Sequence, residues 1–324
     1  MNANVASLIN IADGEIMAKS ADNEARHQPN QQIFGCVEAG GTKFVVGVVS
    51  SAREILETTR FDTVSPDQII GATIDWLKAA QTRHGALSAL GIASFGPVEL
   101  DRAAPNWGHI TATTKAGWSN SDFGGRIERE FGLPVGFDTD VNGAALAEAR
   151  WGAGQAQRVS VYVTVGTGIG GGAIVDGKIL QGLSHPEMGH INVPRHPDDL
   201  GFSGICPFHG DCLEGLASGP AIKARWGCSL SELSADHPAH AIIGWYLAQF
   251  VVTLQSLMEP GRIILGGGVM ATAGLIEHVC TTAGKLGKGY FRGMADDIVV
   301  APLLGTNAGL LGALALAQDI LGER

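Results

Sequence analysis

Apolar and polar positions fall into short blocks along the chain, and these blocks predict an α/β order of elements. After residue 32, two runs rich in β-branched residues flank a Gly-Gly turn, which predicts a β-hairpin. A second strand, glycine turn and strand occupy residues 159–175. Helical spacing predicts helices over residues 66–84, 123–131 and 141–151, and apolar runs predict strands at residues 89–95, 135–138 and 262–265.

The two predicted hairpins resemble each other at a fixed offset. VEAGGTKFVVGVV, from Val37, matches VTVGTGIGGGAIV, from Val163, so that Gly40 falls on Gly166. A fixed offset between two similar units indicates two copies of one α/β domain facing each other. The alternative is a chance likeness between two glycine-rich hairpins.

Residues 1–32 precede the first predicted strand and end in a polar stretch. We expect a poorly ordered N-terminal extension, with a short docked helix as the alternative because apolar residues near the start show helical spacing. The chain has 324 residues, enough for two domains beyond this extension.

Composition narrows the function classes. Charged residues make up 17% and hydrophobic residues 45%, as in a compact globular protein. The formal charge of -10 would repel a polyanion, so we expect no nucleic acid as a ligand. The first fifteen residues lack Lys and Arg, and the uncharged run 159–175 is rich in Gly and Thr. We therefore expect a cytoplasmic protein with no membrane partner.

Three glycine clusters could bind phosphate or a nucleotide. The turns Gly40–Gly41 and Gly166–Gly168 leave backbone N–H groups free to approach a phosphate, and Gly266–Gly268 would admit a flat ring or a ribose. Neither hairpin is a Walker P-loop, and each cluster could instead be a structural turn. Beside the first turn, Glu38 offers a carboxylate for a magnesium shell.

Asp140 lies between a predicted strand and a predicted helix. An aspartate there commonly caps the first helical turn through backbone N–H groups. The alternative is a general base, because a carboxylate at the mouth of a cleft can accept a proton from a hydroxyl that attacks a γ-phosphate.

Two histidines and two cysteines form the strongest local pattern. Three of them are spaced Cys-x2-His-x2-Cys, and a tetrahedral zinc ion takes four N or S ligands. We predict a structural zinc site with His185 and His196 as rival fourth ligands; the predicted ligands are His190, Cys206, His209 and Cys212. The five scattered cysteines of the chain favour reduced thiols over a disulfide scaffold.

Two carboxylates flank the predicted zinc ligands. Glu187 stands in HPEMGH and Glu214 follows Cys212 by two residues, so the zinc loop would direct both toward one place. Carboxylates accept hydrogen bonds from sugar hydroxyls well. The alternative is a pair of solvated acids.

Together these motifs carry a family resemblance. EAGGTKF, the Asp140/Asn142 pair, VGTGIGGG, HPEMGHI, CPFHGDCLEG, ILGGGV and LLGTNAGLLGALALA resemble the ROK family of sugar kinases from about residue 33 to residue 317. EAGGTK, RHPDD and CPFHGDCLEG are similar to its bacterial fructokinase branch. The resemblance implies an ATP-dependent hexose kinase, most similar to fructokinases, that acts on fructose and is a homodimer.

The resemblance also implies a fold and its division. It implies two ribonuclease-H-like domains of the actin-like ATPase type around a central cleft. We place the N-terminal domain at residues 33–136 and the C-terminal domain, with the zinc loop, at residues 137–307. A C-terminal helix at about residues 308–321 is expected to pack on the first domain.

The resemblance also implies roles for the site residues, and for Asp140 it favours the general base over the helix cap. Asp140 would be the general base. Sugar contacts would come from Glu187, His190, Glu214 and Asn142. The β- and γ-phosphates would be held by Gly40, Gly41, Thr42, Lys43, Gly166, Thr167 and Gly168, and the adenosine would border Gly266, Gly267 and Gly268.

Two positions depart from the family pattern. Thr139 replaces the first Asn of the usual Asn-Asp-x-Asn, and His209 replaces one cysteine of the usual three-cysteine zinc loop. Both bear on sugar choice, so a mannose, glucose or other hexose kinase is the first alternative. A sugar-binding regulator is the second, but only Lys19 and Arg26 are basic in the first 32 residues, and a DNA-binding module needs a larger basic surface.

Overall fold

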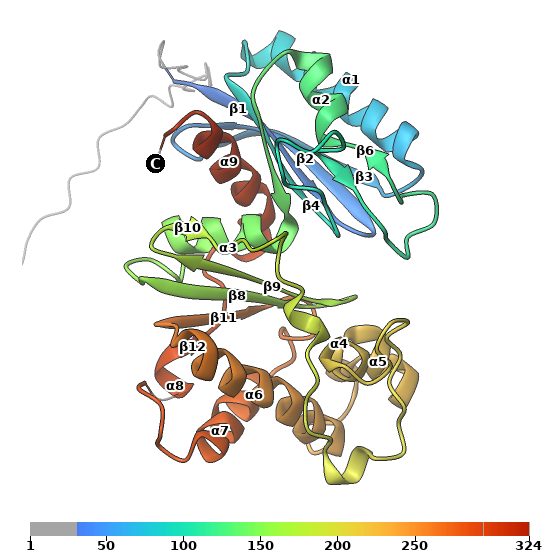
Figure 1. Cartoon of the computed structure of the whole chain (residues 1–324), viewed down its shortest axis with the longest axis vertical. Helices are drawn as coiled ribbons and strands as arrows, with labels where there is room; N and C mark the ends of the chain where they lie inside the picture. The colour runs from blue at the N-terminus through green and yellow to red at the C-terminus, as the bar shows by residue number, and fades with distance from the viewer. Residues whose placement is uncertain (1–30, 294, 324) are drawn as a thin grey trace, which may run out of the picture. The chain divides into compact units, whose positions relative to one another are not determined.

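The computed structural model describes residues 31–293 and 295–323 (Figure 1). The expectations for the N-terminal extension concern residues 1–30 almost entirely and lie outside the described residues. From Gln32 onward the chain forms one compact unit.

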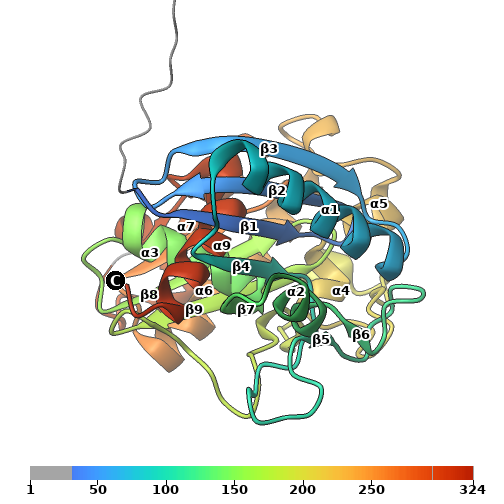
Figure 2. The same ribbon diagram turned by 90° about the horizontal axis from the view of Figure 1, so that it is seen from above.

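The first sheet is built from residues of the N-terminal half. Its order is β3-β2-β1-β4-β7, and the strands lie side by side in Figure 2. β1 pairs antiparallel with β2 and parallel with β4, which is parallel to β7. The strands are β1 (Ile33–Ala39), β2 (Lys43–Ser50), β3 (Ile55–Asp62), β4 (Ala89–Ser94) and β7 (Val135–Thr139).

The second sheet repeats the plan of the first. Its order is β10-β9-β8-β11-β12, with β8 antiparallel to β9 and parallel to β11. β8 and β9 therefore occupy the places of β1 and β2, which supports the internal repeat over a chance likeness. The strands are β8 (Val159–Val165), β9 (Ile169–Val175), β10 (Lys178–Ile179), β11 (Arg262–Gly266) and β12 (Val299–Val300).

The predicted helices are present, and several others accompany them. Prolines occupy the first turn of α1, α5 and α6, where a missing N–H costs nothing. The α-helices are α1 (Pro66–His84), α2 (Gly124–Phe131), α3 (Asp140–Trp151), α4 (Leu213–Ala217), α5 (Gly219–Trp226), α6 (Pro238–Met258), α7 (Leu275–Gly287), α8 (Ala295–Ile298) and α9 (Ala308–Ile320). The 3-10 turns are η1 (Met188–His190), η2 (Pro197–Asp199), η3 (Leu230–Glu232) and η4 (Gly305–Asn307).

Helices and sheets alternate in layers (Figure 1). One core joins the first sheet to α1 and α2, and another joins the second sheet to α6 and α7. A third core lies between the sheets and contains α3 and α9. The strand alternation explains this arrangement: Val161 and Val163 face α6, whereas Tyr162 faces the middle layer.

The two middle helices approach each other closely. A Cβ built on Gly312 of α9 would lie 2.4 Å from the carbonyl carbon of Gly143 in α3. Only glycine leaves room for backbones at this spacing. α9 also packs on β1 and β4, so the C-terminal helix completes the core beneath the first sheet.

The position of β7 bears on the division of the chain. The predicted boundary between the two domains falls between residues 136 and 137. This boundary lies inside β7, which is an edge strand of the first sheet. The division into domains stays a prediction.

Helix α6 was not predicted from the sequence. Among the described residues, α6 is the one helix long and apolar enough to cross a membrane by length and composition, and 56% of its most apolar window is buried. It packs in the same core as α7 and the second sheet. Its periodicity was hidden because apolar residues occur all round the helix.

The segment between β4 and α2 contains a short antiparallel ladder. β5 (His109–Ile110) pairs antiparallel with β6 (Ser121–Asp122), and Val98 bridges Ile110. Trp118 is 1% exposed and donates a hydrogen bond from Nε1 to the Val64 carbonyl at 2.9 Å. The excursion after β4, residues 95–123, is therefore anchored to the first sheet through a buried aromatic side chain.

Candidate active site and metal centre

Asp140 begins α3 at the end of β7, but it is not the cap of that helix. Thr139 is the N-cap: its Oγ accepts a hydrogen bond from the Asn142 amide at 3.1 Å. The capping alternative for Asp140 was therefore wrong, because a threonine one residue earlier supplies the cap. The Thr139 hydroxyl is 4% exposed and already engaged in this bond.

The Asp140 carboxyl has the protonation behaviour expected of a base near neutral pH. Burial raises its pKa to about 7, helped by the nearby carboxylates of Glu38 and Glu187 and opposed by a hydrogen bond that Oδ1 accepts from the Val141 amide. A pKa close to the working pH is efficient for proton acceptance.

A buried polar pair lies beneath Asp140. Asn142 is 1% exposed, and its amide donates to Oδ1 of Asp138 at 2.7 Å. Oδ2 of Asp138 accepts from Gln181 at 3.2 Å, and burial raises the Asp138 pKa. Asn142 as a direct sugar contact stays a prediction; in this structure its amide supports Asp138.

Glu38, at the end of β1, packs against the start of α9. A Cβ on Gly309 would lie 2.3 Å from Cδ of Glu38, so this glycine makes room for the carboxyl group. Burial raises the Glu38 pKa, while the positive charges of Lys43 and Arg60 lower it. The Gly309 of the LLGTNAGLLGALALA motif thus belongs to the same site as the first glycine turn.

The four predicted zinc ligands come together in space. His190 Nδ1 lies 3.6 Å from the Cys206 Sγ, 3.5 Å from the Cys212 Sγ and 3.4 Å from the His209 Nδ1. Zinc bonds of about 2.3 Å to sulfur and about 2.0 Å to nitrogen give tetrahedral N···S edges of about 3.5 Å and N···N edges of about 3.3 Å. The four donor atoms, all within 4.8 Å of one another, therefore have the spacing of a tetrahedral zinc site.

The rival fourth ligands lie elsewhere. His185 accepts a hydrogen bond from the Val98 amide, and His196 accepts one from the Asp198 amide. Neither joins the cluster that His190 completes. The five cysteines are free, which agrees with reduced thiols.

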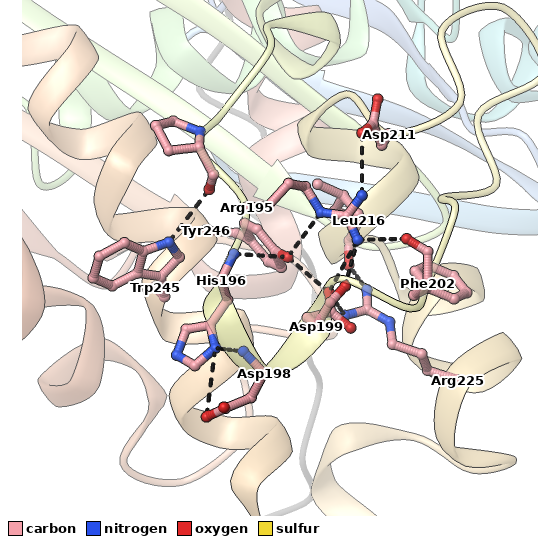
Figure 3. Close-up of polar contacts among 11 residues, drawn as sticks. Arg195, His196, Asp198, Asp199, Phe202, Asp211, Leu216, Arg225, Trp245 and Tyr246 are labelled. Carbon is pink, nitrogen blue, oxygen red and sulfur yellow. Dashed lines mark hydrogen bonds and ion pairs between the residues drawn. The ribbon is translucent and has the colours of Figure 1, made fainter.

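A buried polar network anchors the loop that carries the cluster (Figure 3). Oδ2 of Asp199 accepts from the Tyr246 hydroxyl of α6 and from Arg225 of α5, both at 2.7 Å. Arg225 also donates to the Leu216 carbonyl of α4, and Arg195 donates to the carbonyls of Asp199 and Phe202. The RHPDD segment thus joins the zinc loop to α4, α5 and α6.

Glu214 connects the metal cluster with the second glycine hairpin. Its Oε2 accepts a hydrogen bond from the Ile169 amide at 2.9 Å, and its Oε1 lies 4.0 Å from Nε2 of His190. His190 thus turns one ring nitrogen to the cluster and the other to Glu214. The Glu187 side chain is 49% exposed, which leaves its carboxylate accessible to a ligand.

A pocket of about 650 Å³ opens between the second glycine hairpin and α5. Gly268 lines it, whereas Gly266 is buried and Gly267, at φ 92°, lies against the Val165 backbone. The glycine turn and α5 meet through a hydrogen bond that the Gly219 amide donates to the Gly166 carbonyl at 2.7 Å. The lining also includes Gly166, Thr167, Gly219, Pro220, Lys223, Cys228 and Glu232.

The first glycine turn lies outside this pocket's lining. The Gly40 amide donates to the Lys43 carbonyl at 2.9 Å, and Thr42 and Lys43 are exposed. Lys115 donates to the Gly41 carbonyl, so a side chain from the excursion after β4 rests on the turn.

Several residues of the site were missed from the sequence. Asp138 and Gln181 carry no motif of their own, and α5 with the turn η3 borders the pocket without any glycine signature. The one available signal was that Asp138 directly precedes the Thr139–Asp140 pair at a strand end.

Comparisons with known proteins agree with this geometry. A model of the ROK family matches residues 34–320. The chain is 48% identical to a fructokinase of Zymomonas mobilis over 292 residues, covering 89% of this chain and 97% of that protein. It is 42% identical to a fructokinase of Lactococcus lactis, covering 76% and 82%.

A solved structure has the same fold. A ROK family glucokinase from Streptomyces griseus, in complex with glucose and AMPPNP, is similar with a TM-score of 0.67 and 27% identity, covering 90% of this chain and all of that one. The actin-like arrangement of two related sheets is therefore shared with a kinase that binds a sugar and an ATP analogue.

Proposed function

The chain belongs to the ROK family, and from this premise we propose that it is an ATP-dependent fructokinase that phosphorylates the 6-hydroxyl of D-fructose. The observation that carries the proposal is the 48% identity to a fructokinase over nearly the whole of both chains. The proposal includes a homodimer, expected from the family resemblance, and a cytoplasmic location, expected from the sequence pattern.

Asp140 acts as the general base in this proposal. Its carboxylate accepts the proton of the 6-hydroxyl as that oxygen bonds to the γ-phosphorus and the bond from phosphorus to ADP breaks. The raised pKa of about 7 supports the assignment, because a carboxyl that binds protons near neutral pH is a stronger base than an ordinary aspartate.

The sugar hydroxyls bind to Glu187, Glu214 and His190. Glu214 is held by the Ile169 amide, so its position relative to the second glycine hairpin is fixed before sugar binds. The Nε2 of His190 faces the same place. Zinc, when bound by His190, Cys206, His209 and Cys212, supplies four bonds that hold this loop and leaves the His190 proton on Nε2.

The nucleotide lies along the glycine turns. The pocket lined by Thr167, Lys223 and Gly268 has room for the adenosine. The turn at Gly40–Lys43 supplies backbone donors for the phosphates. Glu38 would hold magnesium through water, and the ion would supply positive charge for the β- and γ-phosphates.

The assigned substrate predicts a preference among hexoses. We expect kcat/KM for fructose to exceed that for glucose by at least about tenfold, with mannose second, because a ketohexose and an aldohexose present their hydroxyls at different positions to fixed carboxylates. An assay of ADP release over a panel of hexoses measures this ratio. Glucose equal to or better than fructose would overturn the fructose assignment.

The packing of Glu38 predicts an effect of Gly309→Ala on metal use. The added methyl group would displace the Glu38 carboxyl, so we expect the magnesium concentration for half-maximal rate to rise at least about fivefold. Gly284→Ala, at a half-buried position within α7 with open space around its Cβ, is the matched control and should leave this value unchanged. Equal magnesium dependence of the two variants would remove Glu38 from the metal site.

A further inference from the structure

His185 connects the segment that carries Glu187 with the loop that follows β4. Its side chain is 5% exposed, and its Nε2 accepts a hydrogen bond from the Val98 amide at 3.1 Å. On the other side of the ring, Nδ1 lies 3.4 Å from Oε1 of Glu187. The imidazole thus stands between the backbone after the first sheet and a carboxylate proposed to bind sugar.

The bond to Val98 determines which ring nitrogen carries the proton. Nε2 accepts from an amide N–H, so it has no proton of its own. A neutral imidazole carries one proton, which must then be on Nδ1. The nitrogen that carries it lies 3.4 Å from Oε1 of Glu187, and a donor at that place restricts the carboxylate to fewer orientations.

A second bond fixes the same segment. Gln181, which lies four residues before His185 in the sequence, donates a hydrogen bond to Asp138 of β7. Residue 181 is thus joined to β7 and residue 185 to the loop after β4, while Leu183 between them is fully exposed. The two attachments define the path of the chain just before Glu187.

We propose that His185 is a positioning residue for the sugar: with its proton on Nδ1, it holds the Glu187 carboxylate in the orientation that accepts a sugar hydroxyl. The inference rests on the proposed function for the role of Glu187. Through Val98, the orientation of Glu187 depends on the loop that follows β4, so the N-terminal half of the chain contributes to sugar affinity.

The tautomer of His185 is measured on the wild-type protein without substrate. Nitrogen-15 NMR of protein labelled at histidine, with the signal identified by its absence in His185→Gln, should show a protonated Nδ1 and an unprotonated Nε2 at neutral pH. A protonated Nε2 would overturn the proposal. This result does not depend on whether fructose is the substrate, so it separates failure of the inference from failure of the proposed function.

Kinetics of paired variants test the positioning role. In His185→Phe the fructose KM should rise at least about tenfold, while kcat stays within about threefold and the ATP KM within about twofold. His185→Gln retains a donor and an acceptor in one side chain, so its fructose KM should stay within about threefold of wild type. His84→Phe is the control for loss of a partly buried histidine outside the site, where the ring contacts Glu57.

Two kinetic outcomes contradict the inference. A fructose KM within twofold of wild type in His185→Phe would show that Glu187 needs no such partner. Equal increases in KM for His185→Gln and His185→Phe would show that the ring packs rather than positions a carboxylate.

Discussion

Replacement of Asp140 by Asn should lower kcat by about 10² to 10⁴ while ATP still binds. Asn keeps the size of the side chain and most of its hydrogen bonding but cannot accept the proton of the attacking hydroxyl. Steady-state kinetics for kcat and equilibrium binding of an ATP analogue measure the two properties. Activity within a few-fold of wild type would exclude Asp140 as the base.

The thermal stability of Asp140→Asn distinguishes a catalytic role of Asp140 from a structural one. The pKa of Asp140 is about 7 in the folded protein, against an ordinary value near 3.8. Between about pH 4 and pH 7 the carboxyl group is therefore ionised in the unfolded chain but still protonated in the folded protein. The folded state consequently loses stability as the pH rises through this range. Asn has no such proton. We therefore expect Asp140→Asn to melt no lower than wild type at pH 8, and a lower melting temperature would point to a structural role.

The same pKa predicts the pH dependence of the wild-type enzyme. The base acts only when it is deprotonated, so kcat/KM should fall about tenfold per pH unit below about pH 7. A profile that stays flat down to pH 5 would contradict the raised pKa.

Replacement of Cys212 by Ala should have the second largest effect, because it removes a ligand at the start of α4. We expect less than half an equivalent of zinc per chain, a melting temperature lower by about 10 °C and a fructose KM higher by at least about tenfold. Metal analysis of protein purified without chelator, thermal unfolding and kinetics measure these in turn. The KM rises because Glu214 and His190 adjoin the same ligands.

Cys280→Ala is the matched control, since Cys280 is buried in α7 away from the cluster. It should keep one equivalent of zinc and the wild-type KM. If Cys212→Ala loses stability but keeps the wild-type KM, zinc and sugar binding are independent. Less than half an equivalent of zinc in the wild type would refute the metal assignment itself.

Elements with a strong local pattern could be predicted from the sequence. α1 spans the predicted residues 66–84, because Pro66 begins it and apolar residues recur on one face. The repeated sheets followed from the matching hairpins, and the metal cluster followed from the Cys-x2-His-x2-Cys spacing.

Contacts between distant segments could not be predicted in this way. The bonds from Val98 to His185 and from Gln181 to Asp138 join residues without shared spacing in the chain. Even at Asp140 the local rule chose the wrong residue, because aspartate and threonine both cap helices and only the backbone decides which of them stands at the cap.

The place of α9 in the middle layer has a consequence for synthesis on the ribosome. Phe34 and Cys36 of β1 share a core with Ala313 and Leu314, about 280 residues later in the chain. The first sheet therefore emerges from the ribosome long before the helix that covers its inner face. Until translation ends, one apolar side of that sheet is open to chaperones and to aggregation. A protein made from a message truncated before α9 would keep this side exposed.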